Sequence, residues 1–273
     1  MTAQPRGASW PYIPILVILA VWIFPIAWMA LTSFKPASEL AGLRPTFLFA
    51  PTIDNYIALF RDYGYSHFLR NSLLLASGTT IVSMLFACLA AFGLVNLHAR
   101  ASEPVAMWIL SLRMLPPIAT VVPFYLLFNS AHLLDSYFGM VLAYLSFSLP
   151  FAIWMLQGFF AEVPRSLAEA AAADGAGPLN VLFKIILPVA RSGVVVTAIF
   201  TFIFAWNEFL FAFLLTDTRW VTLPVALGKT STPYQTDWGT LGAGGMVSFL
   251  PLVAVVFLLQ REMVRGFTLG AVK

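Results

Sequence analysis

The chain has 273 residues, of which 60% are hydrophobic and only 10% are charged, and its mean hydropathy is +0.87. Soluble domains carry roughly 25% charged residues, so this composition excludes a soluble globular protein and indicates a polytopic membrane protein. The net charge of +3 is small and spread along the chain, which argues against a nucleic-acid-binding surface. The single cysteine, Cys88, lies in an apolar run, so an intrachain disulfide is excluded and a cysteine-based metal site is implausible.

Apolar runs long enough to cross a bilayer recur along the whole sequence. A helix needs about 20 apolar residues to span the hydrocarbon core, and charged or polar intervals separate runs of this length. The sequence therefore predicts an all-α fold with six transmembrane helices in one transmembrane domain, 1–273. The predicted spans cover about 11–33, 71–96, 105–128, 137–160, 192–215 and 240–260, with a polar loop at 161–190, an outer loop at 216–239 and a tail at 261–273.

The distribution of basic residues predicts the orientation in the membrane. Six spans place both termini on one side, and eight basic residues fall on that side: Arg6, Arg100, Arg165, Lys184, Arg191, Arg261, Arg265 and Lys273. The longer loops of the other side carry six: Lys35, Arg44, Arg61, Arg70, Arg219 and Lys229. Because cytoplasmic loops are enriched in Lys and Arg, both termini and the 161–190 loop are expected in the cytoplasm.

The third predicted span combines a charge with a helix break. Arg113 precedes the pair Pro116-Pro117, and a charged side chain beside irregular backbone at membrane depth marks a cavity or a buried partner. Arg113 lies roughly two turns into the span, so its side chain could instead extend back to the interface. Both interpretations stay open at this point.

The fifth predicted span contains Trp206-Asn207-Glu208, and Glu208 is the only carboxylate within a span. An intramembrane acid is functional by default. Carboxylates, amides and aromatic faces also hold hydroxyl-rich solutes well, which makes these three residues and Arg113 candidates for a substrate pathway or gate. Alternatively, Glu208 joins one helix to another or faces the external water.

The polar loop at 161–190 has the features of a docking element for a separate protein. Ser166 and Glu169 match a capping box, in which the two side chains satisfy free amides at a helix start. The alanines that follow favour a slim helix, and Asp174-Gly175 predicts a left-handed stop. A second short helix is expected over Leu179–Ile186, ending where Pro188 leads into the fifth span.

This loop resembles the cytoplasmic signature of binding-protein-dependent ABC importer permeases. The signature is Glu-Ala-Ala, three residues, Gly, nine residues, then Ile-x-Leu-Pro, and it is matched by Glu169, Ala170, Ala171, Gly175, Ile185, Leu187 and Pro188. Four further segments are similar to carbohydrate-uptake permeases of the maltose type, specifically the shorter six-span partner: Leu133–Asp135, Pro116-Pro117, Phe204–Leu210 and Gly266–Lys273. The resemblance covers essentially the whole chain.

The resemblance implies a type I ABC importer fold, alternating access and several partners in a bacterial inner membrane. A second, related permease subunit would complete the pathway, and two cytoplasmic ATP-binding subunits would receive a coupling helix formed with Ser166, Glu169 to Ala171, Asp174 and Gly175. An extracytoplasmic solute-binding protein would deliver a sugar or a sugar derivative. The loop at 216–239 would reach into it, with Thr230, Pro233, Tyr234 and Gln235 as candidates, and the tail would touch the ATP-binding subunits.

No catalytic site, metal site or cofactor site is expected in this chain. Gly228-Lys229-Thr230 looks like the end of a phosphate-binding loop, but position 223 is Leu where that motif needs Gly. ATP and Mg would therefore be bound by the partner subunits. Two alternatives are an importer permease for a non-carbohydrate solute and an ion-coupled secondary transporter. The latter would need several intramembrane acids and an internal repeat, neither of which is evident.

Overall fold

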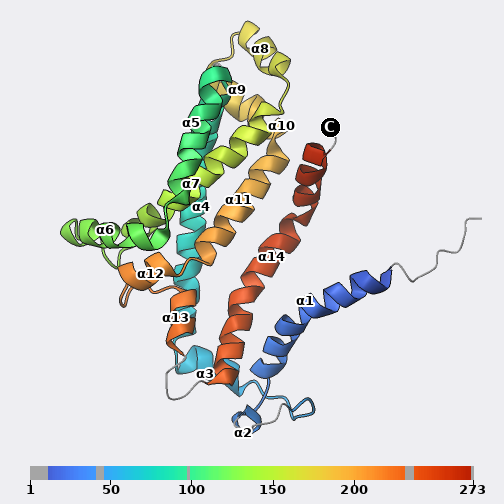
Figure 1. Ribbon diagram of the computed structural model, residues 1–273, viewed down its shortest axis with the longest axis vertical. Coiled ribbons are helices and arrows are strands. Elements are labelled where there is room, and N and C mark those ends of the chain that lie inside the picture. Colours follow the sequence, from blue (N-terminus) through green and yellow to red (C-terminus); the bar gives the residue numbers. More distant parts are fainter. Residues whose placement is uncertain (1–11, 41–45, 97–98, 231–236, 272–273) are drawn as a thin grey trace, which may run out of the picture. The chain divides into compact units, whose positions relative to one another are not determined.

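The computed structural model describes residues 12–40, 46–96, 99–230 and 237–271, and the described residues form helices without any strand, as the all-α prediction requires. Figure 1 shows these helices, which in chain order are α1 Tyr12–Ser33, α2 Ala37–Leu40, α3 Asp54–Arg61, α4 Tyr65–Asn96, α5 Ala99–Ser111, the 3₁₀ turn η1 Leu112–Met114, α6 Pro117–Ser130, α7 Tyr137–Ala161, α8 Arg165–Ala173, α9 Pro178–Val181, the π-helical turn η2 Leu182–Ile186, α10 Leu187–Val189, α11 Arg191–Trp206, α12 Leu210–Leu215, α13 Leu223–Lys229 and α14 Trp238–Ala271.

Four of the described helices are long and apolar enough to cross a membrane: α1, α4, α7 and the part of α14 up to Gln260. Two further pairs of consecutive helical segments meet the same criterion when each pair is taken together. Glu103–Met114 and Pro117–Ser130 are bent by 83° relative to each other, and Pro178–Val189 and Arg191–Trp206 are bent by 85°. The described part of the chain therefore contains four spans, or up to six if each bent pair crosses as one unit.

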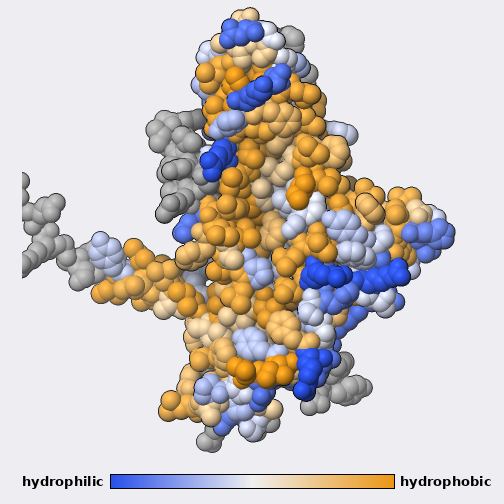
Figure 2. All heavy atoms as spheres, turned by 180° about the vertical axis from the view of Figure 1, so that it is seen from behind, coloured by the Kyte–Doolittle hydropathy of each residue, from blue (hydrophilic) through white to orange (hydrophobic). Residues whose placement is uncertain are grey.

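Within the chain, the contacts define two compact units. The smaller unit comprises residues 1–65 and 227–249, and the larger unit comprises residues 66–226 and 250–273. Figure 2 shows hydrophobic side chains over long stretches of the visible surface, with hydrophilic ones near the top of the view and in a second group lower on the right. Such a surface suits a protein that meets lipid along its helices and water at their ends.

Close helix contacts at glycines organise the smaller unit. A Cβ added at Gly242 of α14 would lie 3.1 Å from the backbone N of Ser33 and 3.2 Å from the carbonyl oxygen of Met29, both in α1. Without side chains between them, the two helices approach closely, as small residues allow in membranes. The end of α1 is held by Asn55 of α3, whose Nδ2 donates to the carbonyls of Ser33 (2.9 Å) and Lys35 (2.8 Å).

The core of the larger unit forms around α7. This helix packs against both α11 and α5, and Leu156 and Phe160 of α7 are buried with Ala87 and Ala91 of α4. Gly193 of α11 faces the Phe159 ring of α7, where a Cβ would lie 2.2 Å from a ring carbon. The buried alanines of α4 make it an inner helix of this unit.

Two predicted spans are interrupted. The stretch predicted at 105–128 is helical to Met114, breaks at Leu115-Pro116 and resumes in α6 at an angle of 83°. The paired prolines cause this break, since Pro117 cannot donate a backbone hydrogen bond and Pro116 disfavours a helical residue before it. The stretch predicted at 192–215 ends its first helix at Trp206 and begins α12 at Leu210.

Helices also extend beyond the ranges that hydropathy predicts. The second span begins at Tyr65 rather than about 71, and the last helix continues through the predicted tail to Ala271. The outer loop at 216–239 contains α13, and the first connection contains α2 and α3. Hydropathy marks the apolar part of a helix, whereas the helix itself continues through polar residues wherever the backbone hydrogen bonds continue.

A turn at Asp135 fixes the segment that follows α12. The Asp135 carboxylate accepts hydrogen bonds from the backbone N–H groups of Thr218 (3.1 Å), Arg219 (2.8 Å) and Trp220 (2.8 Å). The N–H of Asp135 donates to the carbonyl of Leu215 at 2.8 Å. Asp135 itself has a φ of 49°, a left-handed conformation that Asp tolerates better than most residues. One side chain thus ties the α6–α7 turn to the residues after α12.

Two residues of α4 hold the same segment from another side. The Nδ2 of Asn71 donates to the carbonyls of Arg219 (2.8 Å) and Val221 (3.0 Å), and the Ser72 hydroxyl accepts from the N–H of Leu223 at 2.8 Å. Residues 218–223 therefore form an ordered platform before α13, not a free loop.

We expect Asp135→Asn to lower the stability of the protein by about 1–2 kcal/mol at neutral pH, because the amide NH₂ cannot accept the backbone donors. Partial burial raises the pKa of the Asp135 carboxyl, but the hydrogen bonds from Arg219, Trp220 and Thr218 lower it more, so the net pKa lies below its ordinary value. A depressed folded-state pKa contributes stability above the unfolded pKa, and this stability is lost as the pH falls through the folded value. The difference between wild type and variant should therefore shrink below about pH 4.

Thermal unfolding of the purified protein in detergent across a pH series measures this difference. Asp217→Asn is the matched control, because Asp217 is an exposed neighbouring carboxylate that makes none of these contacts. Equal stability of Asp135→Asn and wild type at pH 7 would contradict the assigned role.

Candidate functional site

The predicted docking helix exists as α8, but its start differs from the prediction. The helix begins at Arg165, Pro164 occupies the N-cap position, and no side chain caps the helix. Its first hydrogen bond runs from the N–H of Leu167 to the carbonyl of Pro164, at 3.1 Å. The capping box of Ser166 and Glu169 is therefore wrong, because the helix starts two residues earlier than a Ser166 cap requires, and Ser166 lies inside it, past the position from which a side chain can cap.

The predicted left-handed stop of α8 is confirmed. Gly175 has a φ of +82°, its N–H donates to the carbonyl of Ala172 at 3.0 Å, and the N–H of Ala176 donates to the carbonyl of Ala171 at 2.9 Å. These two bonds make a Schellman motif, which satisfies carbonyls left free at the helix end. Asp174 is the C-cap residue that precedes the glycine.

The α8 helix presents two different faces. Ala168 and Ala171 are partly buried against the core of the larger unit. The residues of the opposite face are exposed: Ser166, Leu167, Glu169, Ala170 and Asp174. Two more apolar side chains, Leu179 and Phe183, are exposed in the next helical segment, at 58% and 50%. The helix is thus anchored by small alanines and offers a mixed acidic and apolar face to a partner.

The segment after α8 is one helical unit with a π turn inside it. The sequence predicts a helix over Leu179–Ile186, whereas α9, η2 and α10 together run from Pro178 to Val189. The N–H of Leu187 donates to the carbonyl of Leu182, five residues back. The next residue, Pro188, has no N–H to donate, and the widened π turn lets the helix continue through it.

This segment connects the α8 helix with the membrane helix α11. Leu182 and Ile186 of the π turn are buried in the core, Ile185 and Leu187 are half-buried, and Pro188 is exposed. α8 packs against both α9 and η2, and α10 packs against α11. The axis turns by 85° at Ala190, between Val189 and Arg191. Movement of α8 would therefore be carried to the start of α11 through packed side chains.

A cavity of about 510 Å³ in the larger unit brings Arg113 and Glu208 together. The Arg113 guanidinium lies over two phenyl rings, 4.3 Å from the centroid of Phe204 and 4.7 Å from that of Phe151. No ion pair joins Arg113 to Glu208, although both are described and both line the cavity. The remaining lining is mainly apolar: Leu112, Leu115, Pro117, Thr120, Phe124, Ser146, Phe147, Phe204 and Phe211.

The interruption of the fifth span explains where Glu208 lies. Its carboxylate accepts hydrogen bonds from the N–H of Phe211 (2.9 Å) and from the N–H of Ala212 (3.1 Å), at the start of α12. Glu208 thus satisfies amides that the helix break would leave without partners. The side chain is half-buried and lies at the cavity wall. Glu208 is therefore a cap on the next helix of the same span.

The other predicted pathway and loop residues have different surroundings. Trp206 is 2% exposed, stacks on Phe202 and does not line the cavity. Asn207 is exposed, and its Nδ2 donates to the carbonyl of Ile203 at 2.8 Å. Thr230 follows α13 and donates to the carbonyl of Leu227 at 2.7 Å. Three further predicted loop residues lie outside the described ones: Pro233, Tyr234 and Gln235.

The sequence did not single out the aromatic walls of this cavity. Phe204 and Phe211 are two among 25 phenylalanines, and nothing in their spacing distinguishes them from lipid-facing ones. Only the charge beside a proline pair, at Arg113, indicated that a cavity lies here.

Residues 83–268 match the family described as binding-protein-dependent transport system inner membrane component. Curated relatives match over nearly the whole chain. A probable ABC transporter permease protein, y4oR of Sinorhizobium fredii, is 35% identical over 94% of this chain and 92% of its own length. The trehalose transport system permease protein SugB of Mycobacterium tuberculosis is 34% identical over 98% of both chains. A third relative, the sulfoquinovosyl glycerol transport system permease protein SmoH of Agrobacterium fabrum, is 31% identical over 98% of this chain and 94% of its own.

Solved structures share the fold at low sequence identity. One is a chain from the crystal structure of a bacterial ABC transporter involved in the import of the acidic polysaccharide alginate, with a TM-score of 0.77, 20% identity, and coverage of 96% of this chain and 100% of that chain. Another is from the bacterial alginate ABC transporter in complex with alginate pentasaccharide-bound periplasmic protein, with a TM-score of 0.68, 13% identity, and coverage of 94% and 95%.

The chain therefore belongs to the family of binding-protein-dependent transport system inner membrane components, and it is a membrane permease of the ABC importer class. This confirms the family to which the Glu169 loop and the C-terminal half were assigned from their residues.

We expect Glu208→Leu to destabilise the protein by about 2–4 kcal/mol, because the N–H groups of Phe211 and Ala212 would lose their acceptor away from water. Glu208→Gln keeps one acceptor oxygen and should cost clearly less. The measurement is the unfolding midpoint of the purified protein in detergent, with Asn207→Leu as the control on an adjacent exposed residue. If Glu208→Leu unfolds at the same temperature as wild type, the capping role is wrong.

Proposed function

We propose that this chain is the transmembrane permease subunit of an ATP-driven, binding-protein-dependent importer for a sugar or a sugar derivative. The observation that carries the proposal is the anchored α8 helix in a member of this family: a capped helix held by alanines on one face and free on the other. The sugar class is supported by relatives named for trehalose and for sulfoquinovosyl glycerol. In this proposal the chain is a transport component and catalyses no reaction itself.

The exposed face of α8 receives the force of ATP hydrolysis from two cytoplasmic ATP-binding subunits. Glu169 and Asp174 provide charge on this face, and Leu167 provides apolar area. The segment from Pro178 to Val189 then carries the displacement into α11, whose other end is followed by Asn207 and by Glu208, which lines the cavity. Closure of the ATP-binding subunits thereby switches the pathway by alternating access. ATP and Mg are bound by those subunits.

The Arg113–Glu208 cavity is the part of the solute pathway that this chain contributes. Phenyl rings can cover the apolar faces of a sugar ring, while the guanidinium and the carboxylate exchange hydrogen bonds with hydroxyl groups. The Arg113 side chain offers donors that also suit an anionic sugar derivative. A second, related permease subunit supplies the facing wall.

The platform at 218–223 and the residues after α13 face the extracytoplasmic side in this proposal, with both termini in the bacterial cytoplasm. An alginate transporter with this fold has been solved with a sugar-loaded periplasmic protein. We infer that a solute-binding protein docks on the corresponding surface here, and that Thr230 and the following residues contact it.

Uptake by the reconstituted complex tests the function. Proteoliposomes that contain this chain, its partner permease and the ATP-binding subunits should accumulate labelled trehalose, or the sugar identified by mass spectrometry in the co-purified binding protein. Accumulation should require both ATP inside and binding protein outside. Uptake driven by an ion gradient through this chain alone would overturn the proposal in favour of a secondary transporter.

We predict that Glu169→Lys weakens assembly with the ATP-binding subunits, since it reverses a charge on the exposed face of α8. Recovery of those subunits in a pull-down with the tagged permease should fall about tenfold, the loss expected for one charged interface contact. Glu103→Lys is the matched control, because Glu103 is exposed at the start of α5 and lies outside α8. Equal recovery with both variants would refute the role of Glu169.

A further inference from the structure

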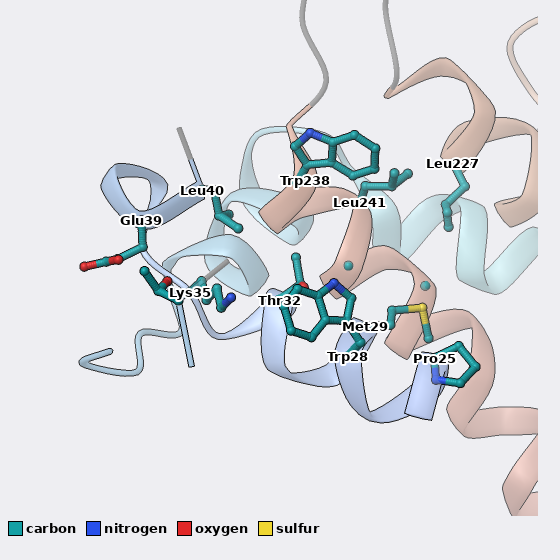
Figure 3. Close-up of a pocket in the computed structure, with 13 residues that line it drawn as sticks. Pro25, Trp28, Met29, Thr32, Lys35, Glu39, Leu40, Leu227, Trp238 and Leu241 are labelled. Carbon is teal, nitrogen blue, oxygen red and sulfur yellow. The ribbon is translucent and has the colours of Figure 1, made fainter. Parts of the chain in front are cut away.

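A second cavity, of about 480 Å³, lies entirely within the smaller unit and is separate from the coupling helix and the Arg113–Glu208 cavity. Figure 3 shows it between the end of α1, the short α2 and the start of α14. It is lined by Pro25, Trp28, Met29, Thr32, Lys35 and Glu39 of the first part of the chain, and by Leu227, Trp238, Leu241, Gly242 and Gly245 of the second, with Leu40 and Thr46 at its edge.

A buried lysine forms one end of this cavity. Lys35 is only 3% exposed, and its Nζ lies 4.6 Å from the centroid of the Trp28 ring and 5.4 Å from that of Phe49. These two rings are its neighbours, and within the described residues its ammonium group makes no ion pair or hydrogen bond. Figure 3 shows the Glu39 carboxylate turned away from the ammonium group. Burying an ammonium group without an anion beside it costs free energy. An anionic group bound at this end of the cavity would offset that cost.

The backbone around Lys35 is held in place before any ligand arrives. The carbonyl of Lys35 accepts a hydrogen bond from Asn55 at 2.8 Å, and the hydroxyls of Ser33 and Tyr56 are 2.8 Å apart. The side chain of Lys35 is therefore presented from an ordered helix end, which lowers the entropy cost of binding.

Polarity changes along the length of the cavity. The lining runs from Pro25 in α1 to Lys35, two residues beyond the end of the helix at Ser33. The helical part from Pro25 to Ser33 alone rises about 12 Å, a little under half of the hydrocarbon thickness of a bilayer. The polar lining residues cluster at the Lys35 end: Thr32, Lys35, Glu39 and Thr46. Towards Pro25 the lining is apolar, and there Gly245 of α14 faces the thioether of Met29.

A cavity whose lining is polar at one end and apolar at the other fits an amphiphile better than a sugar. A sugar carries hydroxyl groups on all sides and needs polar partners around it, whereas this cavity has them at one end only. Trp28, which the Lys35 ammonium group contacts, and Trp238 both line the cavity, and tryptophan is a residue type enriched at membrane interfaces. The depth, the single cation and the apolar far end together match one phospholipid molecule.

We propose that this cavity is a specific binding site for a phospholipid, with the phosphate at Lys35 and the start of an acyl chain along Met29 and Pro25. The lipid occupies the space beside the close contact of α1 with α14 and stabilises the smaller unit. This role is independent of the transported solute, because neither α8 nor the Arg113–Glu208 cavity takes part in it.

Native mass spectrometry of the full-length chain, delipidated in a neutral detergent and titrated with phosphatidylglycerol, tests the proposal. We expect one lipid to bind saturably, and Lys35→Met to raise its Kd about tenfold or more, as loss of a charge-assisted contact does. Lys35→Arg should restore binding. Lys229→Met is the matched control, because Lys229 is exposed and does not line the cavity. Circular dichroism shows whether each variant is folded.

Three comparisons of ligands complete the test. Diacylglycerol, which lacks the phosphate, and glycerol phosphate, which lacks the chains, should both bind at least tenfold more weakly than phosphatidylglycerol. Equal binding of any one of them, or of phosphatidylglycerol to folded Lys35→Met and wild type, would overturn the site. Saturable binding of trehalose that displaces the lipid would also overturn it and would identify the cavity as a sugar site.

Discussion

The structure depends on satisfying backbone hydrogen bonds where membrane helices break. At membrane depth an unpaired N–H or C=O group costs several kcal/mol, so each interruption must supply its own partners. The carboxylate of Glu208 provides them for α12, and the π turn before Pro188 accommodates the missing proline N–H. Both devices lie where the chain changes direction or interrupts a span, and both adjoin the regions to which we assign function.

α11 connects these two regions. It has 16 residues, about 24 Å of helix, and it begins next to the segment that follows α8 and ends next to Glu208. Its packing against α7 over much of its length makes it a stiff element. Glycine at position 193 allows close contact with Phe159, so the helix is held from one end to the other. In the proposed mechanism, a displacement at α8 would reach the cavity through one packed helix instead of through a loop.

The Asp135 turn and the Lys35 cavity show two uses of buried or partly buried charge. Asp135 is surrounded by backbone donors, and its charge is satisfied within the chain. Among the described residues, the ammonium group of Lys35 lies over two aromatic rings and makes no ion pair, and in the proposed lipid site a phosphate would pair its charge. Arg113 lies between these cases, stacked on two phenyl rings while lining an open cavity. A charge whose hydrogen-bond partners lie within the chain has a structural role, whereas a charge without such partners is available to bind a ligand. The surroundings of the charged group, and not its residue type, decide between these roles.

The sequence by itself determined the membrane class, the approximate positions of the apolar helices, the short helix with its stop at Gly175 and the family. These features depend on composition, hydropathy and residues at fixed local spacing. Only the tertiary structure decided that Trp206 is a core residue, that Glu208 caps α12, that Pro164 and not Ser166 is the N-cap of α8, and that Asp135 holds residues 218–220. The burial of Trp206 and the Asp135 contacts depend on residues far apart in the sequence. The Glu208 cap depends on where the fifth span breaks, and the α8 start differs from the prediction by two residues. Local residue patterns do not encode these features.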